Sequence, residues 1–132
     1  MTLHTNGKDM IASALGDSSG SRAAAANYLA LTANSGSPAA SDTTLTGEIT
    51  TASGGLIRAA ATYAHTTGAA TYTLTKTFTA NGSDSLPVTI AKVGVFNASS
   101  GGTMVWSALL SSTATLTASG DTLAITETIT AA

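Results

Sequence analysis

The chain has 132 residues, of which 43% are hydrophobic and 9% are charged, and its formal net charge at pH 7 is −2. This length suits one domain with a single core, and the hydrophobic content excludes the composition of a disordered chain. The absence of cysteine excludes a disulfide framework and a thiolate metal site. The cations are scattered along the sequence, which argues against an electrostatic nucleic-acid binder. They are Lys8, Arg22, Arg58, Lys76 and Lys92.

The low charge content favours a protein that is buried in an assembly. Ordinary soluble domains carry about 25% charged residues, and a free domain usually stays soluble through mixed surface charge. In this chain Thr, Ser, Ala and Gly are abundant instead of charged residues. The N-terminus lacks a basic region followed by an apolar run, so we expect no signal peptide. No apolar segment approaches the ~20 residues of a membrane span, so we expect no membrane partner.

The N-terminal part, residues 1–22, is predicted to be an arm that precedes a β-sandwich domain over residues 23–132. Residues 1–6 are expected to be flexible. A short helix is predicted over residues 8–15, because apolar residues recur there at helical spacing and a glycine follows. Asn6 is the predicted cap of this helix.

The apolar stripe of this helix is a candidate partner-binding surface. It contains Met10, Ile11 and Leu15. Two interpretations of the stripe stay open: it contacts a neighbouring subunit in an assembly, or it plugs one end of its own sandwich.

The segment from the arm to the middle of the chain mixes strands and loops. A strand is predicted over residues 26–33, although its alanines also suit a helix. A loop follows, and residues 43–48 are predicted to form one helical turn capped by Asp42. Residues 56–65 are predicted to form one strand, and residues 66–69 a turn.

Alternation is clearest in two later segments, residues 71–80 and 122–130. In the first, Tyr72, Leu74 and Phe78 point to one face while threonines point to the other. In the second, the apolar face is formed by Leu123, Ile125 and Ile129. Turns are predicted over residues 81–85 and 119–121.

Two charged residues interrupt these apolar faces. The favoured interpretation is that each face becomes exposed where Lys76 and Glu127 lie, and the alternative is a cross-strand pair between them. Glu48 and Arg58 are a second candidate pair, because they flank the same loop. Either pair would be structural.

The densest run of large apolar residues, residues 86–110, is predicted to be the central hairpin of the fold. It contains the only Trp of the chain and consists of two β-rich runs, which a polar break over residues 97–102 separates. A separate short strand is predicted over residues 113–118. Strands thus recur at roughly 8–15 residues with turn chemistry between them. The predicted fold is all-β: an antiparallel, jelly-roll-like β-sandwich with a short N-terminal helix or arm.

No catalytic or ligand-binding motif is present. Residues 16–21 superficially match a trypsin-like nucleophile segment, but no suitable His base and Asp orienter accompany it. His4 and His65 are the only imidazoles and lack further ligands at coherent spacing. Asp84 and Asp121 lie in turns without the acid ladder of a calcium loop. We therefore expect a non-enzyme that binds no metal or cofactor.

Four stretches of the chain, taken in order, resemble a family of small structural proteins of tailed bacteriophages. The motifs are a Y-x-A-L strand, a P-A-A-x-D-T-x-L loop, a G-x-F-N-A-x-x-G-G-T-M hairpin and a G-D-x-L-x-I-T final strand. They lie at residues 28–32, 37–45 (with Glu48 and Arg58 following), 93–104 and 120–126. The resemblance covers most of the chain, and this family carries no catalytic motif. The chain departs from the family's pattern at Glu127, where an apolar or aromatic residue is expected.

The resemblance implies a virion protein that assembles in the host cytoplasm. The main hypothesis is a decoration or minor capsid protein, whose partners are the major capsid protein lattice and copies of itself, as a trimer or through the arm. Candidate contact residues are the helical stripe and, in the polar break, Asn97, Ser99 and Ser100. Multivalent contact of this kind would stabilise the assembled lattice.

The alternative hypothesis is a tail-fibre or tail-associated module that binds another tail protein or a host-surface glycan. A glycan site would use the polar break together with Tyr63 or Tyr72, and would show a shallow groove with an aromatic platform. A small hydrolase would require a polar pocket with converging His and carboxylates, which we do not expect.

Overall fold

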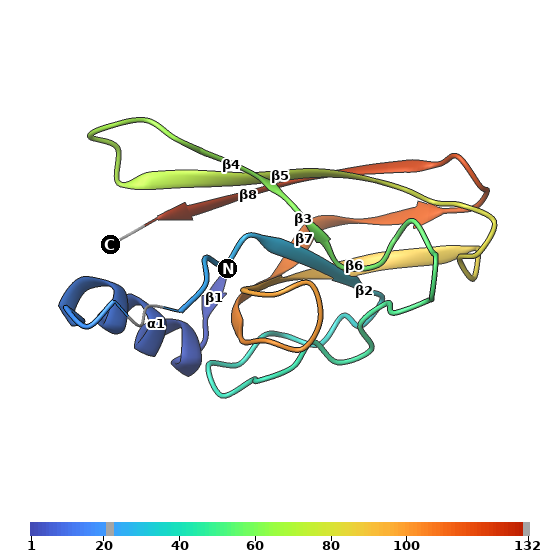
Figure 1. Cartoon of the computed structure of the whole chain (residues 1–132). Coiled ribbons are helices and arrows are strands. Elements are labelled where there is room, and N and C mark those ends of the chain that lie inside the picture. The colour runs from blue at the N-terminus through green and yellow to red at the C-terminus, as the bar shows by residue number, and fades with distance from the viewer. Residues whose placement is uncertain (21–22, 131–132) are drawn as a thin grey trace.

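The structure is a computed structural model, which describes residues 1–20 and 23–130. Two antiparallel sheets pack face to face, and one helix lies at one end beside them (Figure 1). The larger sheet has the strand order β1-β7-β6-β2-β3, and the smaller has the order β4-β5-β8. The elements are β1 (Thr2–Leu3), α1 (Thr5–Gly16), β2 (Tyr28–Thr32), β3 (Ala59–Ala60), β4 (Thr62–His65), β5 (Thr71–Thr79), β6 (Val88–Phe96), β7 (Met104–Leu116) and β8 (Thr122–Thr130). The predicted all-β sandwich with an N-terminal helix is confirmed.

The main core lies between the two sheets, because alternate residues of their strands point inward. The larger sheet contributes mainly leucine and valine, and the smaller sheet contributes the largest buried ring, Phe78. The fully or nearly buried residues are Leu29, Leu31, Ile90, Val93 and Val95 from the larger sheet and Leu74, Phe78, Ile125 and Ile129 from the smaller. The strands predicted over residues 26–33, 71–80 and 122–130 are therefore confirmed.

The predicted central hairpin is confirmed, and β6 is the middle strand of the larger sheet. The separate strand expected over residues 113–118 is wrong: β7 continues through 13 residues from Met104 to Leu116. Its second half pairs with the start of β6, where Val88 faces Leu116. A shift in register between Ile90 and Lys92 lets one long strand follow the other.

The segment predicted as one strand over residues 56–65 is divided between the two sheets. β3 pairs with β2, and β4 pairs with β5. Between them, the Ala61 amide donates to the Asn27 carbonyl at 2.8 Å, so the backbone remains satisfied while the chain crosses from one sheet to the other. The helical turn expected at residues 43–48 is also absent. The Asp42 carboxylate instead accepts a bond from the Ala39 amide at 2.9 Å.

The expectation of a flexible segment over residues 1–6 is wrong. β1 pairs with β7, so that Leu3 lies opposite Trp106. His4 is fully buried, and its ring nitrogens lie 2.8 Å from the Ala39 carbonyl oxygen and 2.9 Å from the Ser107 hydroxyl. Asn6, the predicted cap, lies inside the helix, and His4 occupies the cap position. The boundary predicted between residues 22 and 23 borders residues 21–22, which lie outside the described residues.

Gly7 explains how closely the helix lies on the larger sheet. A Cβ atom at this position would lie 2.6 Å from the Val105 carbonyl oxygen and 2.7 Å from a Leu3 methyl group. Only a residue without a side chain allows α1 to contact the backbone of β7 in this way. The N-terminal segment is thus packed against its own domain through residues 2–7.

Arg58 joins the loop before β3 to the turn between β6 and β7. Its Nε and Nη2 donate to Glu48 Oε1 and Oε2 at 2.8 and 2.7 Å. Its Nη1 donates to the carbonyls of Ala98 and Gly101 at 3.1 and 2.7 Å, and its guanidinium lies 3.5 Å from the centre of the Phe96 ring. The predicted Glu48–Arg58 pair is therefore confirmed, with the bidentate geometry that makes such pairs strong.

The alternative pair between Lys76 and Glu127 is wrong. In the register of β5 and β8, Leu74 faces Glu127 and Lys76 faces Ile125. Among the described residues the structure shows one ion pair, the one between Glu48 and Arg58. Both Lys76 and Glu127 are half-buried near the margin of the apolar face, which agrees with the favoured interpretation that the face becomes partly exposed there.

We predict that Arg58→Ala lowers the free energy of unfolding by about 3 kcal/mol, because it leaves a largely buried Glu48 carboxylate without its partner. Urea denaturation monitored by tryptophan fluorescence measures this change. Lys8→Ala removes a cation from the exposed surface of α1 and should change stability by less than about 0.5 kcal/mol. Equal stability of the two variants would contradict a structural role for Arg58.

Candidate functional site

The exposed large hydrophobic residues gather mainly at one end of the molecule. Among the described residues they are Met1 (50% exposed), Ile11 (40%), Leu15 (85%), Tyr63 (58%) and Leu109 (44%). Met1, Ile11 and Leu15 line one hollow, and Tyr63 packs against Tyr72 in its wall. The β4–β5 hairpin and α1 lie at this end of the molecule (Figure 1). Scattered exposed apolar residues are normal, but a contiguous group usually marks a contact surface.

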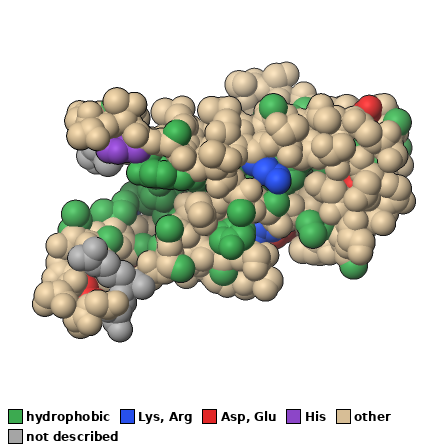
Figure 2. All heavy atoms as spheres, turned by 45° about the horizontal axis from the view of Figure 1, so that its top comes forward, with side chains coloured by type: hydrophobic (Ala, Val, Ile, Leu, Met, Phe, Trp, Pro, Cys, Tyr) green, Lys and Arg blue, Asp and Glu red, His purple; other side chains and the backbone are tan. Residues whose placement is uncertain are grey.

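This group borders a cleft of about 800 Å³, which we call the apolar cleft. Figure 2 shows the hollow at one end of the molecule, with hydrophobic side chains along its walls. It is lined by Met1, Leu3, Ile11, Leu15, Tyr72, Trp106, Thr128, Ile129 and Thr130. No charged side chain lines it, so its walls offer shape and apolar area to a partner rather than ionic contacts.

Five elements, several of them distant in the sequence, position the walls of the apolar cleft. β1 pairs with β7 and thereby sets Leu3 beside Trp106. Ile11 and Leu15 are four residues apart in α1 and so lie on one face of the helix. β5 and β8 pair so that Tyr72 faces Ile129.

An aromatic row runs into the cleft from the hairpin. The ring centres of Tyr63 and Tyr72 are 5.5 Å apart, and those of Tyr72 and Trp106 are 6.4 Å apart in an edge-to-face arrangement. Burial, with a smaller contribution from Tyr63, raises the pKa of Tyr72 to about 12. The hydroxyl of Tyr72 therefore stays protonated at physiological pH and adds no charge to the cleft.

A second hollow, the side groove, continues from the cleft along the open edge of the sandwich. It has a volume of about 390 Å³ and is lined by Met1, residues 108–112 of β7 and residues 123–128 of β8. It shares Met1 and Thr128 with the cleft. Glu127 lies in the side groove, where burial raises the pKa of its carboxyl group and the amino group of Met1 partly opposes this shift.

The predicted contact residues of the helix lie partly at the cleft. Ile11 and Leu15 line it, and Met10 is half-buried and does not. The helix packs on its own domain at Gly7 and leaves Ile11 and Leu15 exposed. Their role in partner binding stays a prediction.

The predicted contact residues of the polar break lie in the turn between β6 and β7 and do not line the cleft. The Asn97 side-chain oxygen accepts a bond from the Thr103 amide at 2.7 Å, so Asn97 holds the turn closed. Ser99 and Ser100 are exposed. Their role in binding also stays a prediction, on a surface separate from the cleft.

Sequence reasoning missed Met1, Leu3 and Ile129 as members of a site. Ile129 was assigned to the core, where one side of it indeed lies, and the first residues were assigned to a flexible segment. The signal that was available is the apolar character of Met1 and Leu3 in a segment otherwise predicted to be solvent-exposed.

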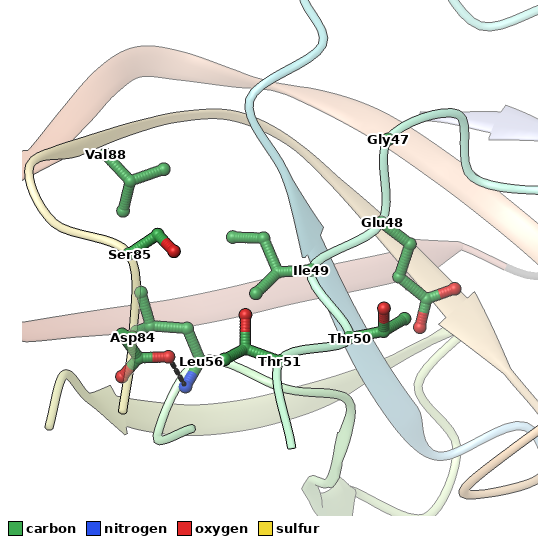
Figure 3. Close-up of a pocket in the computed structure, with 9 residues that line it drawn as sticks. All are labelled: Gly47, Glu48, Ile49, Thr50, Thr51, Leu56, Asp84, Ser85 and Val88. Carbon is green, nitrogen blue, oxygen red and sulfur yellow. Dashed lines mark hydrogen bonds between the residues drawn. The ribbon is translucent and has the colours of Figure 1, made fainter. Parts of the chain in front are cut away.

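A smaller hollow of about 310 Å³ lies between the loop over residues 47–51 and the turn before β6. The two acidic side chains that line it, Glu48 and Asp84, already have bonding partners. Figure 3 shows the Asp84 carboxylate turned toward the Leu56 amide and Glu48 pointing away from it. Asp84 also accepts bonds from the amides of Gly55 at 2.9 Å and Asn81 at 2.8 Å, and Glu48 binds Arg58. The two carboxylates therefore do not form a pair that could act on a substrate.

Asp121 has a similar structural role in the turn before β8. Its carboxylate accepts bonds from the amides of Thr117 and Ala118 at 2.7 and 2.9 Å. The bonds from these backbone amides, with one from the Thr117 hydroxyl, lower the pKa of Asp121. Within residues 1–20 and 23–130, no group of three His, Asp or Glu side chains is placed to hold a metal ion. Within the same ranges, no helix has the length and apolarity needed to cross a membrane.

Comparison with known proteins gives one match. Residues 5–130 match the protein family described as Gp80, Podophage GP4 fiber I protein gp80. The match includes α1 and the strands β2 to β8, and it leaves out β1 and the cleft residues Met1 and Leu3. The comparison with curated proteins found no match, and neither did the comparison with solved structures.

We predict that Glu127→Gln stabilises the protein at pH 7. Because the pKa of Glu127 is raised in the folded state, the charged form destabilises the fold, and this penalty is relieved as the pH falls through the folded pKa toward the ordinary value of 4.5. Thermal melts from pH 7 to pH 4 should show a gain for the variant that shrinks as the pH falls. Asp9→Asn, at an exposed position of α1, controls for the loss of one negative charge. A gain that does not depend on pH would contradict the assignment to the Glu127 carboxylate.

Proposed function

The chain belongs to the Podophage GP4 fiber I protein gp80 family, and from that premise we propose that it is a non-enzymatic structural subunit of a phage tail fibre. The family makes it a phage virion protein. Its description names a fibre, and thereby supports the tail-fibre hypothesis better than the hypothesis of a capsid decoration or minor capsid protein. Assembly onto the virion in the host cytoplasm is part of the proposal.

The apolar cleft is the observation that carries the proposed mechanism. It collects the two exposed large apolar side chains of α1, Ile11 and Leu15, in one hollow without charged side chains that is large enough for several side chains of a partner. We propose that another protein of the fibre inserts apolar side chains between α1 and the overhanging β4–β5 hairpin. Burying Leu15 and Ile11 in this way stabilises the complex through the hydrophobic effect.

A protein partner suits the cleft better than a glycan. Sugars carry many hydroxyl groups, each of which requires a hydrogen-bonding partner once it is buried. The polar side-chain groups at the cleft are few: the hydroxyls of Thr128, Thr130 and Tyr72 and the indole N–H of Trp106. The rings of Tyr72 and Trp106 are half-buried and pack edge to face, so neither offers a broad open platform.

A structural role also agrees with the state of the acidic side chains. Glu48, Asp84 and Asp121 are engaged by Arg58 or by backbone amides. A catalytic acid or base needs a free proton site in a pocket that a substrate can enter. Glu48, Asp84 and Asp121 stabilise loops instead, and Glu127 in the side groove has no His or second carboxylate among the residues that line that groove.

We predict that Leu15→Asp reduces binding to fibre-deficient phage particles about tenfold or more, because it places a charge in a contact that excludes water. The protein is added to particles that lack it, and cryo-electron microscopy locates and quantifies it. Leu15 is 85% exposed, so the variant should keep the melting temperature of the parent.

Ser99→Asp is the matched control, because it adds the same charge to the exposed turn between β6 and β7. It should bind like the parent. Loss of binding in Ser99→Asp with none in Leu15→Asp would move the contact to the turn. Density over the icosahedral shell, and none on the tail, would replace the tail-fibre proposal by the decoration hypothesis.

A further inference from the structure

β8 is an edge strand whose outer side has no partner strand among the described residues. It pairs with β5 along its whole length of nine residues, and the smaller sheet ends there. The other outermost strands are short: β1 and β3 have two residues each, and β4 has four. Because β1 pairs with only Trp106 and Ser107, the second half of β7 also has no neighbouring strand on that side in the described structure. A long edge presents a row of unpaired backbone donors and acceptors, which is a template for another strand.

β8 lacks most of the features that natural edge strands use to prevent such pairing. It contains no Pro, Lys or Arg, and its register with β5 has no bulge. Six of its nine residues are β-branched, which favours extended pairing. They are Thr122, Ile125, Thr126, Thr128, Ile129 and Thr130.

The sequence of β8, TLAITETIT, has threonine at both ends and at its centre, with an apolar residue next to each end. In an antiparallel pair of two β8 strands centred on Thr126, each Thr122 lies opposite Thr130 of the partner subunit, and each Leu123 lies opposite Ile129 of the partner subunit. Like residues thus meet at the ends and at the centre, which stabilises a sheet, while Ala124 meets Thr128 of the partner subunit and Ile125 meets Glu127 of the partner subunit. This self-complementarity favours a second copy of the chain over an unrelated strand.

The side groove supplies apolar area beside this edge. It runs between β7 and β8, and its walls include Leu110 and Leu123, which are half-buried in the isolated chain. A strand added to β8 would cover this margin of the core and remove it from water. Pairing therefore gains both backbone hydrogen bonds and apolar burial.

We propose that two copies of this chain associate through their β8 edges, antiparallel and about a two-fold axis at Thr126, to form one continuous six-stranded sheet. The six strands are β4, β5 and β8 of each copy. The contact is isologous, so each subunit uses the same surface. It requires only the isolated protein, so its failure would leave the proposed fibre function untouched.

Glu127 limits the strength of this pairing. In the proposed register it lies opposite Ile125 of the partner subunit and diagonally from Glu127 of the partner subunit, so two carboxylates approach each other on the inner face. Inward-pointing charge on an edge strand opposes pairing. Lys76 on β5 and the amino group of Met1 are the cations nearest this face, and neither makes an ion pair with Glu127 in the described structure. Glu127→Gln should therefore strengthen the dimer.

Disulfide trapping tests the proposed register, because the chain contains no cysteine of its own. Thr126→Cys places identical thiols opposite each other at the axis, at a separation that a disulfide or a short bismaleimide crosslinker spans. We expect most of this variant to run as a covalent dimer on a non-reducing gel. Thr75→Cys is the matched control: Thr75 is exposed and lies next to Thr126 on β5, one strand in from the edge, and should stay monomeric.

A mixed experiment and a charge variant complete the test. Ala124→Cys mixed with Thr128→Cys should give a heterodimer in excess of either homodimer, because these positions face each other across the axis. Thr126→Lys, which opposes two cations at the axis, should weaken self-association at least tenfold by analytical ultracentrifugation and leave the melting temperature unchanged, and Thr75→Lys should do neither. Trapping of Thr126→Cys no greater than that of Thr75→Cys, with the parent protein monomeric at high concentration, would overturn the proposal.

Discussion

Arg58 is the residue on which the arrangement of the larger sheet depends, because it fixes a loop without regular structure against that sheet. The outer face of β2 and β6 carries Ala30 and Phe96, which together with Leu45 form a second apolar cluster outside the sandwich. No helix covers this cluster in the described structure. The loop that supplies Leu45 is held there by the bonds from Arg58 to Glu48 and to the turn after β6. Lys92 adds a bond to the Gly36 carbonyl at 2.8 Å, so two buried cations tie irregular backbone to the sheet.

Because most of the buried polar side chains stabilise the fold, the features left to bind a partner are apolar side chains and unpaired backbone. Asp84 and Asp121 accept bonds from backbone amides, Glu48 pairs with Arg58, and the buried His4 contacts the Ala39 carbonyl and the Ser107 hydroxyl, as buried polar groups must. Uncovered features lie elsewhere and are of another kind: the apolar walls beside Leu15 and Trp106, and the open backbone of β8. These features bind through shape, apolar area and backbone pairing. They suit a protein whose work is to hold other proteins.

Local pattern was enough to predict β5 and β8 from their alternation and β6 from its dense apolar run, because the turns that bound these segments contain Gly, Asn and Asp. It failed at β3 and β4, where the side-chain pattern is continuous but the backbone changes sheets at Ala61 to reach Asn27. It also failed at β1, because a strand of two residues exists only through its pairing with β7. The apolar cleft was out of reach for the same reason: its walls come from both ends and the middle of the chain.

The two proposed contacts differ in symmetry. An isologous contact through β8 is complete after two copies and cannot by itself continue an assembly. A contact through the apolar cleft uses different surfaces on its two sides, since the side chains that fill the cleft must come from another element. The cleft and the side groove meet at Met1 and Thr128, so a partner in the cleft lies next to the second copy on β8. One end of this domain can therefore join a pair of copies to the next component, while its acidic and cationic side chains keep the loops in place.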